Sequence, residues 1–107
     1  MSRSDWVPAG VSTDTASAAR MYDALLGGSH NFEVDRMAAA RAVRMVPDLP
    51  LVALSNRAFL RRAVRFLVDS GIRQFIDLGA GIPTVGNTHE VAAREDPDCR
   101  VVYVDID

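Results

Sequence analysis

Two acidic residues and two glycines in this sequence have the types and spacing of a nucleoside-binding site. Asp77 lies two residues before Gly79 and four before Gly81, and Asp105 follows a second segment of similar composition. Glycine lets a backbone turn sharply and lets a ligand come close to it. A carboxylate beside such a loop can accept hydrogen bonds from the two hydroxyls of a ribose. The residues predicted to bind the ligand are Asp77, Gly79, Ala80, Gly81, Asp105 and Ile106.

Two apolar segments must position these side chains. Residues 75–78 lie between Gly71 and Gly79, and residues 101–104 directly precede Asp105. Their composition is typical of strands that are buried on both faces. The chain between them is long enough for a crossover helix, which predicts a βαβ unit with parallel strands. Ligands of open α/β sheets bind at the carboxyl ends of the strands, where both acidic residues fall.

The glycine loop also indicates which nucleoside is bound. A dinucleotide fingerprint needs a third glycine, but here that position is Thr84, and Gly86 is displaced by two residues. Asp77 is a poor neighbour for a pyrophosphate and a good one for a cation. S-adenosylmethionine has no phosphate, and its ammonium and sulfonium are both positive, so the pattern favours this cofactor. A fragment of a dinucleotide-binding oxidoreductase stays open as an alternative.

Further segments resemble one known family over nearly all of the chain after about Thr13. These segments are residues 19–28, 31–32, 35–36, 56–63, 74–84, 87–92 and 101–105. In these segments the chain resembles the N-terminal part of the bacterial S-adenosyl methyltransferase family, which was long catalogued as a domain of unknown function. The resemblance implies a Rossmann-like α/β fold of class I and S-adenosylmethionine as the cofactor.

The same resemblance implies that this chain is only part of a domain. Members of the family resemble class I enzymes with seven strands and are well over twice as long. We therefore expect a chain that is truncated after the second strand and incomplete as an enzyme. The residues that contact the methyl acceptor usually come from later strands, so no catalytic residue is predicted and the acceptor stays unknown.

Three helices are predicted before the first strand. One runs from Ser12 or Thr13, either of which can cap it, to Gly27, and a second from Asn31 to about Val46. The third covers residues 51–70 and carries an apolar stripe. Residues 1–13 are expected to form a mobile arm, 14–71 a helical cap and 72–107 the cofactor-binding βαβ unit. The apolar stripe consists of Phe59, Ala63, Phe66 and Leu67.

Some residues of these helices are further candidates for the site. In the resembling family the first two helices precede the sheet and cover the cofactor, and an Asn-Arg pair opens the third. The resemblance therefore adds Asn31 and Arg57 to the predicted cofactor-binding residues, although a plain structural role is the simpler reading of Asn31. The candidates for a lid, meaning side chains of the first two helices that would cover the cofactor, are Tyr22, Asn31, Phe32 and Arg36. The Asn-Arg pair is Asn56 and Arg57.

Composition excludes several other classes of protein. A net charge of −2 argues against a nucleic-acid binder, so Arg61, Arg62 and Arg65 are expected to form a solvated face, with Arg57 as the exception that faces the cofactor site. His89 and Glu90 do not suffice for a metal site, which needs three or four ligands, so His89 is expected to be a hydrogen-bonded structural residue. The single Cys99 and the lack of a long apolar segment predict a cytoplasmic protein without a membrane helix.

Two predictions concern partners. The first strand is expected to have an unpaired apolar edge, through which the chain can associate. A non-enzymatic interaction module, using the N-terminal helices and the arginine face, is the second alternative to a cofactor-binding protein.

Overall fold

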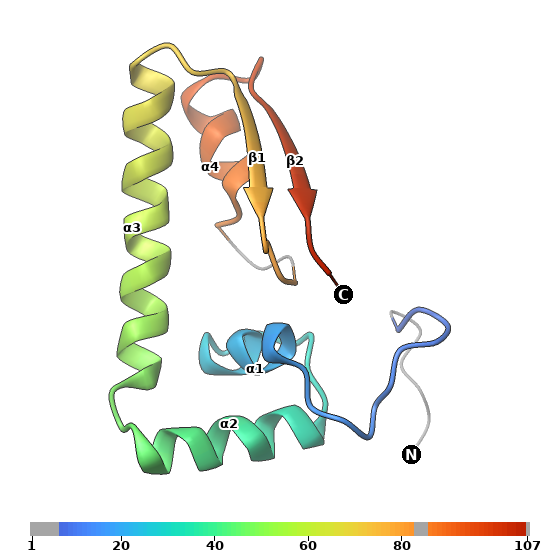
Figure 1. Cartoon of the computed structure of the whole chain (residues 1–107). Coiled ribbons are helices and arrows are strands. Elements are labelled where there is room, and N and C mark those ends of the chain that lie inside the picture. Colours follow the sequence, from blue (N-terminus) through green and yellow to red (C-terminus); the bar gives the residue numbers. More distant parts are fainter. Residues whose placement is uncertain (1–6, 83–85, 107) are drawn as a thin grey trace.

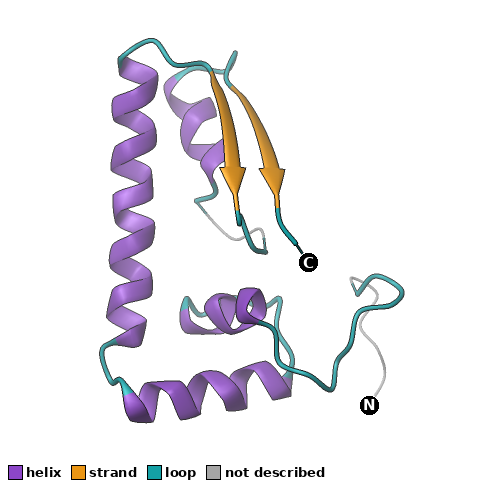
Figure 2. Ribbon diagram, viewed as in Figure 1, coloured by secondary structure: helices purple, strands orange, loops and turns teal. Residues whose placement is uncertain are grey.

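Four helices and one two-stranded parallel sheet make up the computed structural model, which describes residues 7–82 and 86–106 (Figures 1 and 2). The long helix α3 runs beside the strands, and α1 and α2 lie across the end toward which both strands point (Figure 1). The predicted α/β class and the βαβ unit are confirmed. The elements are α1 Ala18–Leu25, α2 Glu33–Met45, α3 Leu49–Asp69, β1 Gln74–Leu78, α4 Thr88–Glu95 and β2 Arg100–Val104.

Helix α1 starts later than predicted. Its N-cap is Ser17, whose Oγ accepts a hydrogen bond from the backbone N–H of Arg20. The Oγ of Ser12 instead accepts from the N–H groups of Asp14 and Thr15, which forms a local turn before the helix. The prediction of a cap at Ser12 or Thr13 was wrong, because a serine satisfies nearby N–H groups as well in a turn as at a helix start. Of the predicted mobile arm, residues 1–6 lie outside the described residues.

Helix α2 begins two residues after the predicted cap Asn31. The N-cap is Phe32, and the carboxylate of Asp35 accepts a hydrogen bond from its backbone N–H at 2.9 Å. This bond is half of a capping box, in which the acidic residue at the third helical position binds back to the N-cap. Asn31 therefore caps nothing, and its side chain contacts α1 instead.

Helix α3 begins two residues earlier than predicted, with Pro50 in its first turn, where the missing proline N–H costs no helical bond. The apolar stripe that the sequence predicted for this helix is not the face that is buried. Phe59 and Phe66 are 61% and 70% exposed, whereas the smaller Val64 and Val68 are both 3% exposed. These valines form the core with Val91 and Ala92 of α4, and Leu60, Phe75, Cys99 and Val101 pack against it.

The two strands are paired in register from Gln74 opposite Arg100 to Leu78 opposite Val104. Alternation places Phe75 and Val101 on the face that packs against the core. The opposite face is exposed, since no described element covers it, and the prediction of burial on both faces was therefore wrong for this chain. On that face Ile76, Leu78, Val102 and Val104 are 70%, 75%, 58% and 45% exposed.

Candidate functional site

A cavity of about 640 Å³ lies at the carboxyl ends of the strands, between them and helices α1 and α3. This volume is in the range of pockets that bind small molecules. Two of its walls come from the βαβ unit and two from the N-terminal helices. The lining residues are 77–82 and 105–106 from the strand ends, Ala18, Ala19, Tyr22 and Asp23 from α1, Leu26 directly after α1, and Asn56, Arg57, Phe59 and Leu60 from α3.

The glycine loop after β1 has the geometry that only glycine adopts easily. Gly79 and Gly81 have φ angles of +67° and +72°, in the left-handed region. The N–H of Gly79 donates to the carbonyl of Val104 at 2.7 Å, so the loop is fixed to the end of β2. A Cβ built on Gly81 would lie 3.9 Å from the Cβ of Ala19, which places α1 directly against the loop.

Asp105 joins this loop to the second strand. Its Oδ2 accepts a hydrogen bond from the N–H of Gly81 at 2.7 Å. A carboxylate offers about four lone-pair sites, so this bond is compatible with further donors such as ribose hydroxyls. The structure thus brings together the predicted residues at the two strand ends in the lining of one cavity, with Ile106 beside Asp105.

Asp77 lies at the end of β1 and is held from α4. The hydroxyl of Thr88, the first residue of α4, donates to its Oδ2 at 2.8 Å. Sequence reasoning missed Thr88, because only the packing of α4 against the sheet brings its hydroxyl to Asp77. The prediction about Thr84 concerns a residue outside the described ones.

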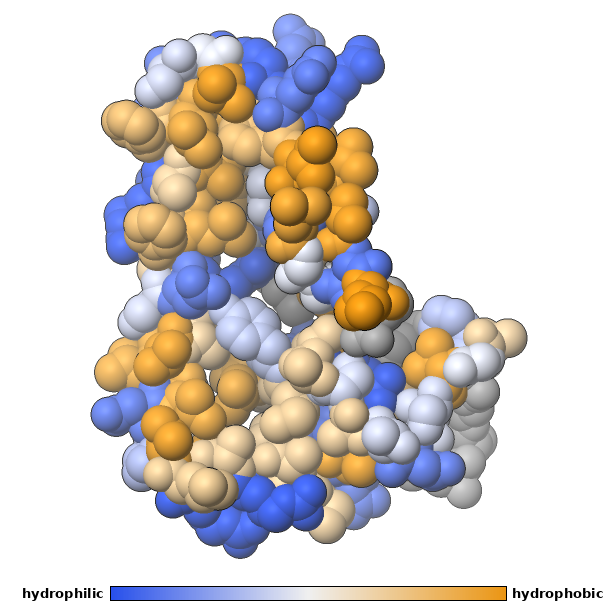
Figure 3. Space-filling view, in the orientation of Figure 1, coloured by the Kyte–Doolittle hydropathy of each residue, from blue (hydrophilic) through white to orange (hydrophobic). Residues whose placement is uncertain are grey.

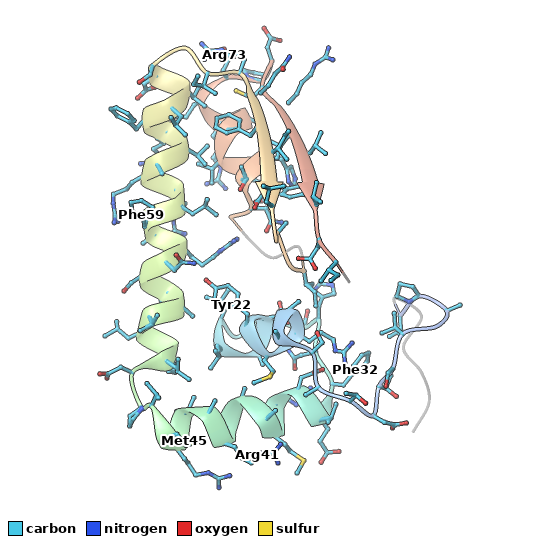
Figure 4. All side chains as sticks on the ribbon, in the orientation of Figure 1. Tyr22, Phe32, Arg41, Met45, Phe59 and Arg73 are labelled. Atoms are coloured by element: carbon cyan, nitrogen blue, oxygen red, sulfur yellow. The ribbon has the colours of Figure 1, made fainter. Side chains whose placement is uncertain are left out.

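The wall formed by α3 contains the Asn-Arg pair of the sequence prediction. Arg57 lines the cavity, and its Nη2 donates to Oδ1 of Asn87 at 3.3 Å. Asn56 donates to the hydroxyl of Tyr22 at 3.0 Å, and this hydroxyl donates to the carbonyl of Ala53 at 3.3 Å. Figure 4 shows Tyr22 reaching from α1 toward α3, so these bonds tie two walls of the cavity together.

The other lid candidates lie at the junction of α1 and α2. Asn31 is 8% exposed and does not line the cavity. Its Nδ2 donates to Oδ2 of Asp23 at 2.8 Å, and its Oδ1 accepts from Nη1 of Arg36 at 2.9 Å. Asp23 was missed as a cavity residue because a carboxylate inside an apolar helical pattern gave no sign that it would be buried. Phe32 and Arg36 do not line the cavity either.

His89 and Tyr103 form a pair on the α4 side of the sheet, outside the cavity lining. The Nδ1 of His89 and the hydroxyl of Tyr103 are hydrogen-bonded, and the backbone N–H of His89 donates to the same hydroxyl at 2.8 Å. Burial raises the pKa of Tyr103, and the negative charges of Asp77 and Glu90 add to this effect. His89 is hydrogen-bonded, in agreement with its expected structural role.

The polar and apolar groups that line the cavity fit a charged nucleoside. Carboxylates from both strand ends can accept hydrogen bonds from hydroxyl and ammonium groups, and the apolar side chains of α1 and α3 can pack on a base. No group of three metal-ligating side chains occurs within residues 7–82 and 86–106. Fold and site together define an α/β protein with a cavity at the carboxyl ends of its parallel strands, the place where open α/β sheets bind ligands.

Comparisons with known proteins identify the family. The family model described as S-adenosyl methyltransferase matches residues 4–107, so the chain belongs to this family. S-adenosylmethionine is the cofactor that the family's name implies, and the predicted recognition is confirmed. No curated protein is significantly similar to the chain.

Two solved structures are similar to the chain. A proposed methyltransferase from Thermobifida fusca YX is 55% identical, with a TM-score of 0.91 over 97% of this chain and 40% of that protein. A DUF574 family protein from Streptomyces avermitilis MA-4680 is 43% identical, with a TM-score of 0.82 over 85% of this chain and 35% of that protein. The chain thus spans well under half the length of both proteins. In the part of the chain that the structure describes, no helix is both long and apolar enough to cross a membrane.

Proposed function

We propose that this chain forms the cofactor-binding part of a bacterial, cytoplasmic S-adenosylmethionine-dependent methyltransferase. The observation that carries the proposal is the cavity in which the glycine loop and the carboxylates of both strand ends meet the wall formed by α1 and α3. The single free thiol, Cys99, supports the cytoplasmic location, because cysteines remain reduced there. The methyl acceptor is not identified by any residue of this cavity.

Each side of the cavity has a distinct task in this proposal. Asp105 accepts hydrogen bonds from the ribose hydroxyls, and the left-handed glycines keep the loop backbone close to the ligand. Asp77, oriented by Thr88, faces the positively charged part of the ligand. When bound, S-adenosylmethionine supplies a methyl group activated by its sulfonium. The apolar residues of α1 and α3 exclude water from that group.

Calorimetric titration of the chain with S-adenosylhomocysteine and with NAD tests the proposal. We expect the homocysteine ligand to bind at least tenfold more tightly than NAD. Asp105→Ala should lower its affinity by about 10-fold to 100-fold, because hydrogen bonds to a charged group contribute about 1.5–3 kcal/mol.

The matched control is Asp98→Ala, which removes an exposed carboxylate from the turn before β2 and should leave the affinity unchanged. Tighter binding of NAD would favour a dinucleotide-binding protein. Equal binding of S-adenosylhomocysteine to the wild type and to Asp105→Ala would remove Asp105 from the site.

A further inference from the structure

The start of α4 is hydrogen-bonded to both strands of the sheet. The hydroxyl of Thr88 donates to Oδ2 of Asp77, and the backbone N–H of the next residue, His89, donates to the hydroxyl of Tyr103, both at 2.8 Å. Asp77 and Tyr103 lie directly opposite each other in the register of β1 and β2. Two consecutive residues of the helix therefore bind one cross-strand pair, which fixes the position and the rotation of α4 at this point.

The bond to Tyr103 acts as a helix cap. The N–H groups of the first helical turn have no partner within the helix, and the side chain of the N-cap residue commonly accepts from one of them. Here the N-cap is Asn87, and its Oδ1 accepts from Nη2 of Arg57 at 3.3 Å. The hydroxyl of Tyr103 accepts from the N–H at the second helical position, so a residue of β2 caps α4.

The chemistry of the tyrosine hydroxyl suits this role. A hydroxyl has one proton to donate and two lone pairs that accept. Tyr103 accepts from the N–H of His89 and is also hydrogen-bonded to Nδ1 of the same residue. Burial raises the pKa of Tyr103 above its ordinary value of 10.0, so the hydroxyl keeps its proton at neutral pH and can donate it to the imidazole.

Thr88 lies between this cap and the cavity. It is 4% exposed, whereas Asp77, to which it donates, lines the cavity. A hydrogen bond weakens steeply when its angle bends, so a small rotation of the start of α4 would weaken the bond that holds the carboxylate. Tyr103 is not among the described lining residues, so it can affect a ligand in the cavity only through the groups that it holds.

We propose that Tyr103 is a positioning residue for ligand binding, because its hydroxyl caps α4 and thereby keeps the hydroxyl of Thr88 on Asp77. This inference rests on the proposed function, in which Asp77 faces the positively charged part of S-adenosylmethionine. It gives a residue outside the cavity a role in the affinity for the ligand.

A double-mutant cycle tests the inference. Calorimetric titration with S-adenosylhomocysteine is carried out on the wild type, Tyr103→Phe, Thr88→Val and the variant with both changes. We expect Tyr103→Phe to lower the affinity about threefold to tenfold, the range that the loss of one hydrogen bond causes. Thr88→Val should lower it at least as much. Adding Tyr103→Phe to Thr88→Val should change the affinity by less than about twofold, because Tyr103 acts through Thr88.

Two further variants separate the cap from other effects. Val102→Thr is the matched control, a change of similar size at the neighbouring residue on the exposed face of β2, and should keep the wild-type affinity. His89→Ala keeps the backbone N–H that donates to Tyr103, so its affinity should stay within about twofold of the wild type. A loss in His89→Ala as large as that expected for Tyr103→Phe would assign the effect to the imidazole and overturn the inference.

The remaining outcomes are distinguishable. A Tyr103→Phe variant that binds as tightly as the wild type overturns the inference and leaves the proposed function in place. The inference is also overturned if the losses of the two single variants multiply in the double variant, since Tyr103 then acts independently of Thr88. If the wild type does not bind S-adenosylhomocysteine, the proposed function fails, and the inference fails with it.

Discussion

Asp35 is a completely buried carboxylate at the junction of α1 and α2. It accepts hydrogen bonds from the backbone N–H groups of Ser17 and Phe32 and from Nε of Arg20, at 2.8–3.0 Å. Burial alone would raise the pKa of Asp35, but these hydrogen bonds and the charge of Arg20 outweigh it, so the pKa lies below the ordinary value of 3.8. One carboxylate thus holds the start of both helices.

The lowered pKa of Asp35 predicts a loss of stability in acid. Because the folded state favours the ionised form, the stabilisation is complete above the ordinary pKa of 3.8 and is lost as the pH falls below it. Urea unfolding followed by circular dichroism at pH 7, 5, 4 and 3 measures this loss. Asp35→Asn should be less stable than the wild type at pH 7, by about 3 kcal/mol, and less sensitive to acid. An equal acid sensitivity of both proteins would show that other groups cause it.

Gly28 is required by a second buried carboxylate, that of Asp23. A Cβ at position 28 would lie 2.1 Å from Oδ1 of Asp23, whose other oxygen accepts bonds from His30 and Asn31. We expect Gly28→Ala to lower the free energy of unfolding by about 2–3 kcal/mol, since the carboxylate must move and weaken these bonds. Ser29→Ala, a change at an exposed neighbour, should cost less than about 0.5 kcal/mol. A tolerated alanine at position 28 would mean that Asp23 moves freely.

At the scale of the elements, α3 has two apolar faces, and one of them forms the core. We expect Val68→Ala to destabilise the chain by about 2 kcal/mol, because it removes two buried methyl groups and leaves a cavity. Phe66→Ala, two residues away on the exposed face, should change stability by less than about 0.5 kcal/mol. Thermal and urea unfolding of both variants measure the difference, and a larger effect of Phe66→Ala would restore the face predicted from the sequence.

The elements could be predicted from the sequence because their signals are local. The glycine loop shows this best: strand, Gly79, Gly81 and helix follow one another, and the structure gives both glycines the left-handed angles that their type allows. The buried face of α3 was not predictable in this way. Valines and phenylalanines occur on neighbouring faces of that helix, and only the position of α4 decides which of them are buried.

In the candidate site, too, the residues with a local signal were predictable and those placed by packing were not. Asp77 and Asp105 were found because the end of a parallel strand is a known place for a ligand. Asn31 was named from the resemblance alone, and the structure places it against Asp23, eight residues earlier in the chain, where a side-chain hydrogen bond holds it. Such a bond between a residue of a connection and a helix leaves no periodic pattern in a sequence.

For the whole molecule, the exposed apolar face of the sheet favours association with another chain. Figure 3 shows apolar side chains gathered on the front of the strands and along α3. The described residues provide one partner strand for β1, so its outer edge keeps backbone groups that can pair with another chain. An exposed apolar patch next to such an edge favours association. We therefore propose that this chain associates through β1 at micromolar concentration.

Ile76→Lys tests this association. Residue 76 lies on the exposed face of β1, opposite Val102, so a lysine there reaches solvent and repels a second copy of the strand. Light scattering after size-exclusion chromatography should give a mass that rises with concentration for the wild type and stays monomeric for Ile76→Lys. The control Met45→Lys changes an 84% exposed residue at the end of α2, far along the chain from the strand, and should associate as the wild type does. A wild type that remains monomeric up to about 100 μM would contradict the proposal, since at that concentration even a weak interface with a Kd near 10 μM is mostly occupied.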